Sequence, residues 1–336
     1  MVMKLDKLLK NYQGPARYRR WKSNNEEIFL QERIKGIGGT DAAAIMGVNP
    51  WKTAYSVWLD KKEIREKEEQ QIINMRMLWG SHLEGPVCDF WNKNDIGQEV
   101  VYYPHVSDQG ITWFDRGYHF LQAHVDAYII EPQNMYASRS NDQLLEHKIT
   151  NIVEVKCVSY HGKGAWYNEY RELVIPKYYQ IQAQHYMGIM GMSRCLFLVL
   201  FEGNNLQHIW LEGDRDFQRD IARSCIDWWN KYIIGSAEPP IEADKERRED
   251  IHSRWGDPIK GFEKEATPEI AYMIEEWKEI KEEAKIQRLA VKEYKNAITN
   301  FLGGASVVVN EDGVPLLNHT RVNRKGKPGY SRFTLL

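Results

Sequence analysis

A series of strand-like segments in the middle of the chain constrains its fold more than any other feature. Apolar and β-branched residues are concentrated at 99–103, 120–130, 152–158, 194–201 and 207–211. A helical segment at 176–190 separates the first three segments from the last two, and Glu202-Gly-Asn-Asn between these two is a hairpin turn signal. Because strands and helices that share one core form layers, this order predicts an α/β fold.

Charged residues occur within two of these predicted strands. Asp126 ends one apolar run, and Glu154 and Lys156 lie inside another. Since side chains alternate along a strand, Glu154 and Lys156 share one face, whereas Val153 and Val155 face a core. Two nearby carboxylates can bind Mg²⁺, and a lysine beside them can orient a water or offset charge on a phosphate. The same triplet also fits an ordinary half-exposed strand, so other segments must distinguish the two.

A glycine-rich segment precedes a short helix near the N-terminus. It reads Arg33-Ile-Lys-Gly-Ile-Gly-Gly-Thr40-Asp41, and either Thr40 or Asp41 is expected to cap a helix over 42–46. Such a loop at a helix N-terminus can bind phosphate, although a plain capped loop remains an alternative.

Two further helices are predicted before the first strand. Residues 49–53 form a turn and cap for a helix that continues through Leu59, and the charged run 61–71 is expected to be solvated. Residues 75–91 show an amphipathic stripe interrupted by Pro86, which predicts a kink or a restart. The stripe consists of Trp79, Leu83, Val87 and Phe90.

Composition favours an ordinary cytoplasmic protein. The 336 residues carry a net charge of −2, so any contact with nucleic acid must come from a local basic surface. The four cysteines form no C-x-x-C pair, which argues against zinc and iron–sulfur sites. No signal-peptide core or membrane-spanning run is present, so a cytoplasmic location without a membrane is expected.

The chain divides into five predicted segments. They are a helical arm at 1–30, a core at 31–238 with an insertion at 131–150, a linker at 239–266, a long helix at 267–304 and a basic β-like tail at 305–336. Thr267-Pro-Glu supplies the start of the long helix, and Gly303-Gly304 ends it. Its apolar residues recur in steps of three and four, except at Gln287, which predicts packing along another helix. The tail carries five basic and two acidic residues, a balance of +3, and fits either a solubilising tail or a flap that faces DNA.

Six ordered sequence blocks resemble the phage-type YqaJ viral recombinases, relatives of lambda exonuclease in the PD-(D/E)xK nuclease superfamily. The blocks cover roughly residues 30–235. They lie at 33–42, 47–53, 79–84, 125–126, 153–156 and 176–187. The resemblance implies a central mixed β-sheet flanked by helices, as in restriction endonucleases. It also implies an exonuclease that requires Mg²⁺, for which Mn²⁺ can substitute.

The resemblance implies a role for each matching residue. Asp126, Glu154, the Val155 carbonyl and Glu84 would bind metal, and Lys156 would be the catalytic lysine. Gln182 and Gln184 match glutamines of the helix after the catalytic strand. Arg33 and Thr40 would hold a terminal 5′-phosphate, and Trp51 and Lys52 could contact the duplex end, although Trp51 also fits a core position. Two departures are Ala127, where the family usually has glycine, and the twenty-seven residues between Asp126 and Glu154.

The resulting hypothesis is a nuclease that degrades the 5′ strand of linear duplex DNA and leaves 3′ overhangs. The resemblance further implies a single-strand annealing protein as partner, a homo-oligomer in the form of a trimeric ring, and the cytoplasm of a bacterial host. Two alternatives remain open: an endonuclease or repair nuclease on the same core, and a DNA-end-binding scaffold without catalysis.

Overall fold

The computed structural model describes residues 12, 14–21, 31–62, 75–94, 100–102, 110–132, 147–241, 260–261, 263–324 and 327–335. The chain separates into two compact units, Met1–Asp257 and Pro258–Leu336, and each is described by itself.

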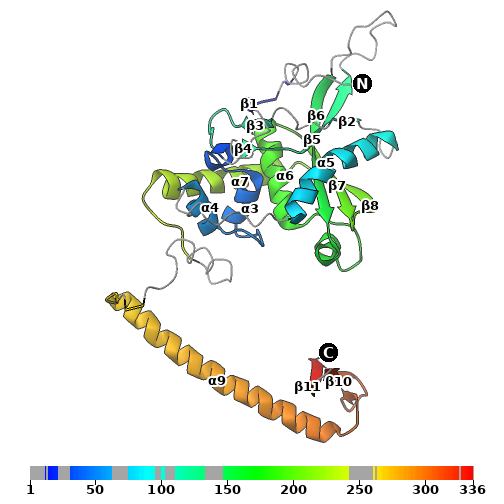
Figure 1. The fold of residues 1–336 in the computed structure, drawn as a ribbon, viewed down its shortest axis with the longest axis vertical. Helices are drawn as coiled ribbons and strands as arrows, with labels where there is room; N and C mark the ends of the chain where they lie inside the picture. The colour runs from blue at the N-terminus through cyan, green and yellow to red at the C-terminus, as the bar shows by residue number, and fades with distance from the viewer. Residues whose placement is uncertain are drawn as a thin grey trace, which may run out of the picture. The chain divides into compact units, whose positions relative to one another are not determined.

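A five-stranded mixed sheet forms the centre of the first unit (Figure 1). Its strands, in spatial order, are β2 (Val100–Tyr102), β5 (Ala127–Pro132), β6 (His147–Val158), β7 (Arg194–Phe201) and β8 (Asn205–Glu212). Only β6 and β7 pair in parallel, and the other neighbours are antiparallel. The predicted α/β fold with a central mixed sheet is therefore confirmed.

Helix α6 (Lys177–Met190) lies in the connection between the two parallel strands. A parallel pair requires such a crossover, whereas the antiparallel pair β7–β8 needs only a short turn. That turn contains Glu202 and Gly203 at φ 55° and 80°, which confirms the predicted hairpin between 201 and 205. The insertion predicted at 131–150 joins two strands that pair with each other, β5 and β6, and residues 133–146 lie outside the described part.

Alternate residues of β6 and β7 belong to two different core clusters. Val153 and Val155 pack in a cluster with residues of α5, whereas Ile152 packs in the cluster that contains the apolar residues of α6. Phe197 of β7 joins the α6 cluster, and its neighbours Leu196 and Leu198 join the α5 cluster. The predicted alternation is thus confirmed, and it turns Glu154 toward α6.

The N-terminal region contains a strand where a helix was predicted. Residues Arg17–Trp21 form β1, which pairs with β3 (Gly110–Phe114), and β3 pairs with β4 (Gln122–Ala123). Tyr12 and Tyr18 place their rings 4.6 Å and 5.5 Å from that of the buried Trp113, so burial and backbone pairing outweigh local helix preference. The helical prediction is wrong for this strand, and most of residues 1–30 lie outside the described part.

Helix α5 (Met75–Lys93) runs through Pro86 as one element, so the predicted restart there is wrong. Its buried face also differs from the predicted stripe. Val87, Cys88 and Trp91 are buried, whereas the side chains of Trp79 and Phe90 are 59% and 51% exposed. The sheet thus covers only the C-terminal part of the helix, which an apolar period alone does not reveal.

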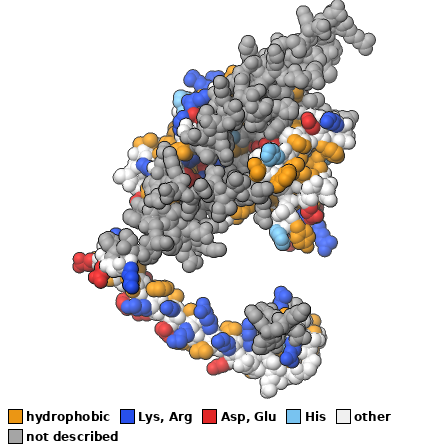
Figure 2. Space-filling view, in the orientation of Figure 1, with side chains coloured by type: hydrophobic (Ala, Val, Ile, Leu, Met, Phe, Trp, Pro, Cys, Tyr) orange, Lys and Arg blue, Asp and Glu red, His pale blue; other side chains and the backbone are white. Residues whose placement is uncertain are grey.

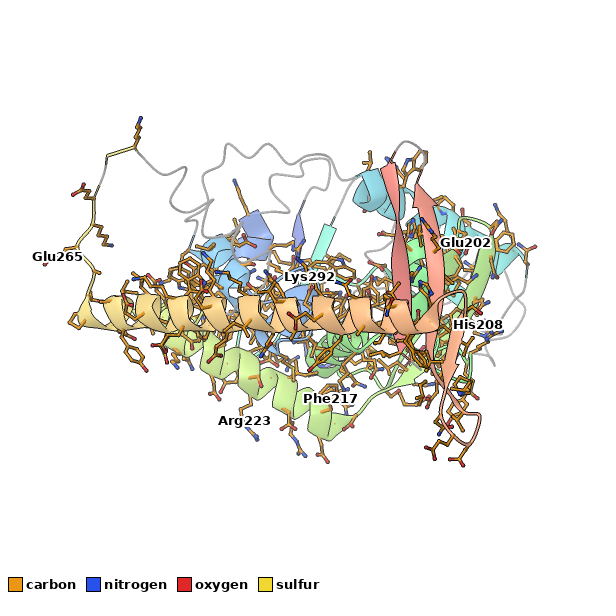
Figure 3. The ribbon with its side chains drawn as sticks, turned by 90° about the horizontal axis from the view of Figure 1, so that it is seen from below. Glu202, His208, Phe217, Arg223, Glu265 and Lys292 are labelled. Carbon is orange, nitrogen blue, oxygen red and sulfur yellow. The ribbon has the colours of Figure 1, made fainter. Side chains whose placement is uncertain are left out.

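Three shorter helices and a π-helical turn complete the core. They are α3 (Gly39–Ile45), α4 (Ala54–Lys61), α7 (Arg215–Trp228) and η2 (Trp229–Ile234), and a 3₁₀ segment η1 covers Tyr160–Trp166. Thr53 caps α4 as predicted, and its hydroxyl accepts a hydrogen bond from Ser56 N. Helix α7 turns Ile221 and Cys225 inward, while Arg223 extends from its outer face (Figure 3).

The second unit consists of one long helix and a small antiparallel sheet. Helix α9 (Pro268–Leu302) begins at Thr267, whose hydroxyl accepts from Ile270 N, and ends at Gly303 with φ 53°. The sheet has the order β11-β10-β9, with bounds Lys327–Leu335, Pro315–Arg324 and Val307–Val309. The predicted long helix and β tail are confirmed. Among the described helices of the chain, none combines the length and apolar character needed to cross a bilayer.

Candidate active site

Asp126, Glu154 and Lys156 meet at the point where β5 begins and β6 approaches its end. Lys156 Nζ lies 2.7 Å from Glu154 Oε2 and 3.4 Å from Asp126 Oδ2. It also lies 3.2 Å from the Val155 carbonyl oxygen, and Val155 N donates to Asp126 Oδ2 at 2.8 Å. The backbone of β6 and the ammonium group of Lys156 therefore fix Asp126 beside Glu154, although twenty-seven residues separate the two acids in sequence.

Burial governs the electrostatics of this group. The side chain of Glu154 is fully buried, and this burial, together with the charge of Asp126, raises its pKa above the usual value. Burial acts to lower the pKa of Lys156, but Asp126 and Glu154 outweigh it and raise that pKa well above the usual value. Lys156 is thus held as a cation among oxygen atoms.

Gln182 and Gln184 have different surroundings, although both were predicted to be catalytic. Gln182 Nε2 donates to Glu154 Oε2 at 2.7 Å. The Gln184 amide instead donates to the Glu212 carbonyl, and its oxygen accepts from Asp214 N and from Gln218 Nε2. Gln184 therefore ties α6 to the β8–α7 connection, and the structure does not bring it to the site.

The oxygen atoms of this group fit a divalent cation. Two carboxylates and the Val155 carbonyl converge there, and hard cations such as Mg²⁺ prefer such oxygen ligands. Glu154 Oε1 is buried and has no hydrogen-bond partner within the described part of the chain, a costly state for a carboxylate oxygen. Clusters of three or more His, Cys, Asp or Glu side chains suited to a metal do not occur among the described residues, so any ion would also need water or substrate ligands.

A cavity of about 380 Å³ opens beside the triplet. Val155, Lys156 and Gln182 line it. The Glu154 carboxylate accepts hydrogen bonds from the Lys156 and Gln182 side chains. Glu84 of α5 and Thr40 of α3 line the same cavity. Three separate parts of the sequence that were predicted to act together therefore share one cavity.

The glycine-rich loop reaches this cavity because α3 lies close to α6. A Cβ atom at Gly39 would lie 2.6 Å from Gln182 Cγ and 2.9 Å from Tyr186 Cε1. Main-chain bonds from Ile37 N to the Phe120 carbonyl and from Gln122 N to the Ile37 carbonyl hold the loop from the other side. Neither Thr40 nor Asp41 is the N-cap residue, so the predicted cap is wrong. Gly38 is the N-cap residue, and Asp41, at the third helical position, accepts a hydrogen bond from Gly38 N at 3.4 Å.

Asp41 is the centre of a buried ionic network rather than a surface cap. Its carboxylate lies 2.7 Å from both Lys52 Nζ and Lys61 Nζ. Burial acts to raise the pKa of Asp41, but the charges of Lys52, Lys61 and Arg33 hold it well below the usual value. Lys61 is almost completely buried, so the predicted solvation of the charged run that begins there is wrong for this residue.

Neither Lys52 nor Arg33 is among the residues that line the cavity. Lys52 Nζ also pairs with Asp60 at 2.9 Å, so two carboxylates neutralise the side chain that was predicted to contact DNA. Arg33 is half-buried and does not line the cavity, and its carbonyl oxygen accepts from Lys61 Nζ at 2.6 Å. A phosphate role for Arg33 thus requires the cavity to extend toward it when DNA binds.

An aromatic group lies at the cavity beside the triplet. Trp51 is 61% exposed, which rules out the core alternative, and its ring packs edge-on against Tyr178 at 4.9 Å. Tyr179 is the next residue in the sequence, and Lys156 Nζ lies 5.4 Å from the centre of the Tyr179 ring. Sequence reasoning missed both tyrosines. Tyr179 lies three residues before Gln182, so helical spacing from a predicted site residue could have identified it.

Comparison with known proteins identifies the first unit. Residues 28–193 match the YqaJ-like viral recombinase domain. The chain carries a domain of this family. A curated relative, the uncharacterized protein YqaJ of Bacillus subtilis (strain 168), is 27% identical over 288 residues, which cover 84% of this chain and 79% of the relative. The predicted family is therefore confirmed, and it supports a nuclease role for the YqaJ-like domain.

Solved exonucleases show weaker similarity to this YqaJ-like chain. The alkaline exonuclease LHK-Exo of Laribacter hongkongensis is 15% identical, with a TM-score of 0.40, over 62% of this chain and 93% of that one. LHK-Exo in complex with dAMP has the same identity and coverage and a TM-score of 0.42. A phage-related exonuclease from Haemophilus somnus 129PT is 13% identical, with a TM-score of 0.34, over 59% and 92% of the two chains. At these TM-scores the similarity carries no argument about activity.

Proposed function

We propose that this chain is a metal-dependent DNA exonuclease of the PD-(D/E)xK type, which degrades the 5′ strand of linear duplex DNA and leaves 3′ overhangs. One observation carries the proposal: Glu154 is buried beside Asp126 and Lys156 with one carboxylate oxygen unpartnered among the described residues. A buried acid in that state is costly to maintain for stability alone, so a bound cation offers the physical reason for it.

Each residue of the site has a distinct task in this proposal. Asp126, Glu154 and the Val155 carbonyl would hold Mg²⁺, or Mn²⁺ in its place, and Glu84, which lines the same cavity, would support a metal-bound water. When bound, the metal would make a water more acidic and offset charge on the phosphate. Lys156 would orient the attacking water, and Gln182 holds the Glu154 carboxylate in place.

End recognition is assigned to residues of the glycine-rich segment and to Trp51. Thr40 offers a hydroxyl to a terminal 5′-phosphate, and Arg33 offers a charge that would reach it on DNA binding. Trp51 is exposed beside Tyr178, where it can stack on the terminal base pair. A single-strand annealing partner, a trimeric ring around DNA and a bacterial cytoplasm are proposed on the family resemblance.

Strand-labelled linear duplex, incubated with and without Mg²⁺ and resolved by product length, tests the proposal directly. The expected products are mononucleotides released from the 5′-labelled strand only in the presence of the metal. Asp126→Ala and Lys156→Ala are expected to abolish turnover while DNA binding persists. Full activity in either variant would refute the assignment of the site.

Closed-circular duplex is the matched substrate control. We expect no cleavage, because a circle has no 5′ end to enter the cavity. Cutting of the intact circle would instead indicate an endonuclease, and binding to ends without hydrolysis would indicate a scaffold. Arg33→Ala is expected to weaken selectively the preference for 5′-phosphorylated over 5′-hydroxyl ends.

A further inference from the structure

Helix α9 carries a heptad pattern over nearly its whole length. Labelling Ile270 as position a places five residues at a and five at d. The a residues are Ile270, Trp277, Ala284, Val291 and Ile298. The d residues are Met273, Ile280, Gln287, Tyr294 and Phe301. We call these ten residues the α9 seam.

The α9 seam is exposed on the C-terminal unit taken by itself. Ile280 and Trp277 are both 62% exposed, Tyr294 is 70% exposed and Phe301 is 80% exposed. Figure 2 shows apolar side chains between charged ones along this helix, and Lys292 lies outside the seam (Figure 3). A helix of 35 residues is roughly 50 Å long, and an apolar stripe of that extent requires a partner helix of comparable length.

The charges that flank the α9 seam indicate which kind of helix covers it. The charged residues at position g are Glu269, Glu276 and Glu283, and those at position e are Lys281, Arg288 and Lys295; the other g and e positions are apolar. In a parallel, in-register coiled coil, each g residue lies opposite the e residue five positions later in the other helix. Glu276 then faces Lys281 of a second copy, and Glu283 faces Arg288 of that copy.

We propose that α9 forms a parallel, in-register coiled coil with a second copy of this chain. An antiparallel pair would bring the basic e positions of the two helices together, which like-charge repulsion disfavours. The polar residue Gln287 supports the same register, because it then faces Gln287 of the second copy and the two amides can hydrogen-bond. Among the described helices of the first unit, the longest is α5 with 19 residues, too short to cover the seam.

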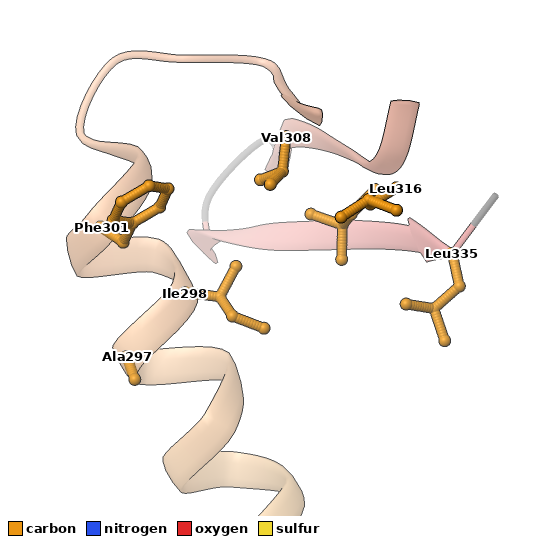
Figure 4. A pocket seen from close by; sticks show the side chains of 7 residues that line it. Ala297, Ile298, Phe301, Val308, Leu316 and Leu335 are labelled. Atoms are coloured by element: carbon orange, nitrogen blue, oxygen red, sulfur yellow. The ribbon is translucent and has the colours of Figure 1, made fainter. Parts of the chain in front are cut away.

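An apolar cavity continues the seam at its C-terminal end. It has a volume of about 450 Å³, and Ile298 and Phe301 line it together with Val308, Leu316 and Leu335 (Figure 4). The last heptad of a second α9 helix can fill this space. Since each nuclease unit joins α9 at the same end of the helix, a parallel coil would tether the nuclease units of all copies at one end.

Charge reversal in the full-length protein tests the proposal by sedimentation or light scattering. Wild-type protein is expected to have a mass of at least twice the 39.5 kDa of one chain. The double variant Glu276→Lys/Glu283→Lys turns both attractive pairs into repulsive ones and should weaken self-association by about tenfold or more. The matched control Glu275→Lys/Glu282→Lys makes the same change on the opposite face of α9 and should leave the mass unchanged.

Complementation distinguishes a specific pairing from loss of folding. Lys281→Glu/Arg288→Glu alone should also weaken self-association, but mixing this variant with Glu276→Lys/Glu283→Lys should restore a mixed oligomer. A monomeric wild type at all concentrations, or unchanged self-association of the charge-reversed variants together with no cross-link between Gln287→Cys chains, would overturn the proposal.

Orientation is tested with the cysteine variant Gln287→Cys in a Cys157→Ser background, which removes the exposed native cysteine. A parallel, in-register coil should give efficient disulfide cross-linking between copies. Cross-linking only between Trp277→Cys and Tyr294→Cys chains would show an antiparallel arrangement and overturn the proposal. None of these measurements depends on nuclease activity, and the cross-link at position 287 reports on α9 itself, so it separates the coil from a ring held together by the nuclease units.

Discussion

Gln182 and Gln184 occupy opposite sides of helix α6. Gln182 hydrogen-bonds the Glu154 carboxylate, whereas Gln184 joins the Glu212 carbonyl, Asp214 N and the Gln218 amide. A separation of two residues rotates the side chain by about 200° around a helix, so both glutamines could not serve one site. Motif matching treats them alike, but their surroundings place one at the candidate active site and give the other contacts that join elements of the fold.

This difference predicts two distinct phenotypes. Gln182→Ala should lower kcat by roughly tenfold or more, because Glu154 loses the donor that orients it, while the free energy of unfolding changes little. Gln184→Ala should lower the free energy of unfolding by about 1–3 kcal/mol, because the Glu212 carbonyl, Asp214 N and the buried Gln218 amide lose their hydrogen-bond partner. Urea denaturation and steady-state kinetics on both variants provide the measurement. Equal effects of the two substitutions on both quantities would contradict the assignment.

Asp41→Asn should destabilise the protein strongly. The change leaves the buried ammonium of Lys61 without its carboxylate, and breaking a buried pair in this way costs about 3–5 kcal/mol. The double variant Asp41→Asn/Lys61→Met should recover part of this loss, because it removes the unpaired charge. Lys163→Ala breaks the exposed pair with Glu202 and serves as a control, with an expected loss below about 1 kcal/mol.

His124 should make stability sensitive to acid. Burial, followed by the charges of Arg33 and Lys61, lowers its pKa from 6.5 to about 3. Since the unfolded state binds the proton more readily, this stabilisation is present above pH 6.5 and is lost as the pH falls toward about 3. We expect the loss between pH 7 and pH 5 to be on the order of 1 kcal/mol smaller in His124→Gln, measured by urea denaturation. An identical pH dependence in the variant would argue against a neutral His124 in the folded protein.

A divalent cation should raise the melting temperature of the wild-type protein. At a Mg²⁺ or Mn²⁺ concentration of about one hundred times Kd, binding stabilises the folded state by about 2.7 kcal/mol, which corresponds to a shift of a few degrees. Asp126→Asn and Glu154→Gln should lose this shift, whereas Glu202→Gln, a change of an exposed acid, should retain it. Calorimetric scans with and without the metal decide the matter, and an undiminished shift in Asp126→Asn would place the metal elsewhere.

Trp51→Ala should impair the use of DNA ends without harming the fold. Because Trp51 is 61% exposed and its ring packs against the half-buried rings of Tyr178 and Tyr179 at the cavity, its loss should leave the melting temperature nearly unchanged. Stacking on a base contributes about 1–3 kcal/mol, so KM for blunt duplex ends should rise by tenfold or more. Tyr160→Ala removes another exposed aromatic side chain outside the cavity and serves as the control.

Sequence patterns predicted the parts of the fold that depend on local period. The strands of the central sheet, α6, α9 and the alternation around Glu154 follow from such periods and from turn and cap residues. Strand β1 was missed because its stability comes from pairing with β3, nearly a hundred residues away. The true buried face of α5 was missed because only part of the helix meets the sheet.

The candidate site, like the fold, could be predicted only where local spacing determines it. Spacing placed Glu154 and Lys156 on one face, but nothing in the spacing indicated that Lys52 and Lys61 both pair with Asp41. Charged residues in a polar run appear equivalent until packing decides which of them are buried. Long-range pairing and burial, which depend on the whole chain, are therefore the information that the local pattern lacked.

Gly39, which precedes Thr40, lies close against the side chain of Gln182. A methyl group at Gly39 would press on the side chain that holds Glu154, so Gly39→Ala would move either the loop that carries Thr40 or the carboxylate itself. In the proposed function, recognition of the DNA end and hydrolysis of the bond would therefore depend on the same close approach of Gly39 to Gln182. The proposed end-recognition loop could then not be exchanged for another without also adjusting the proposed catalytic centre.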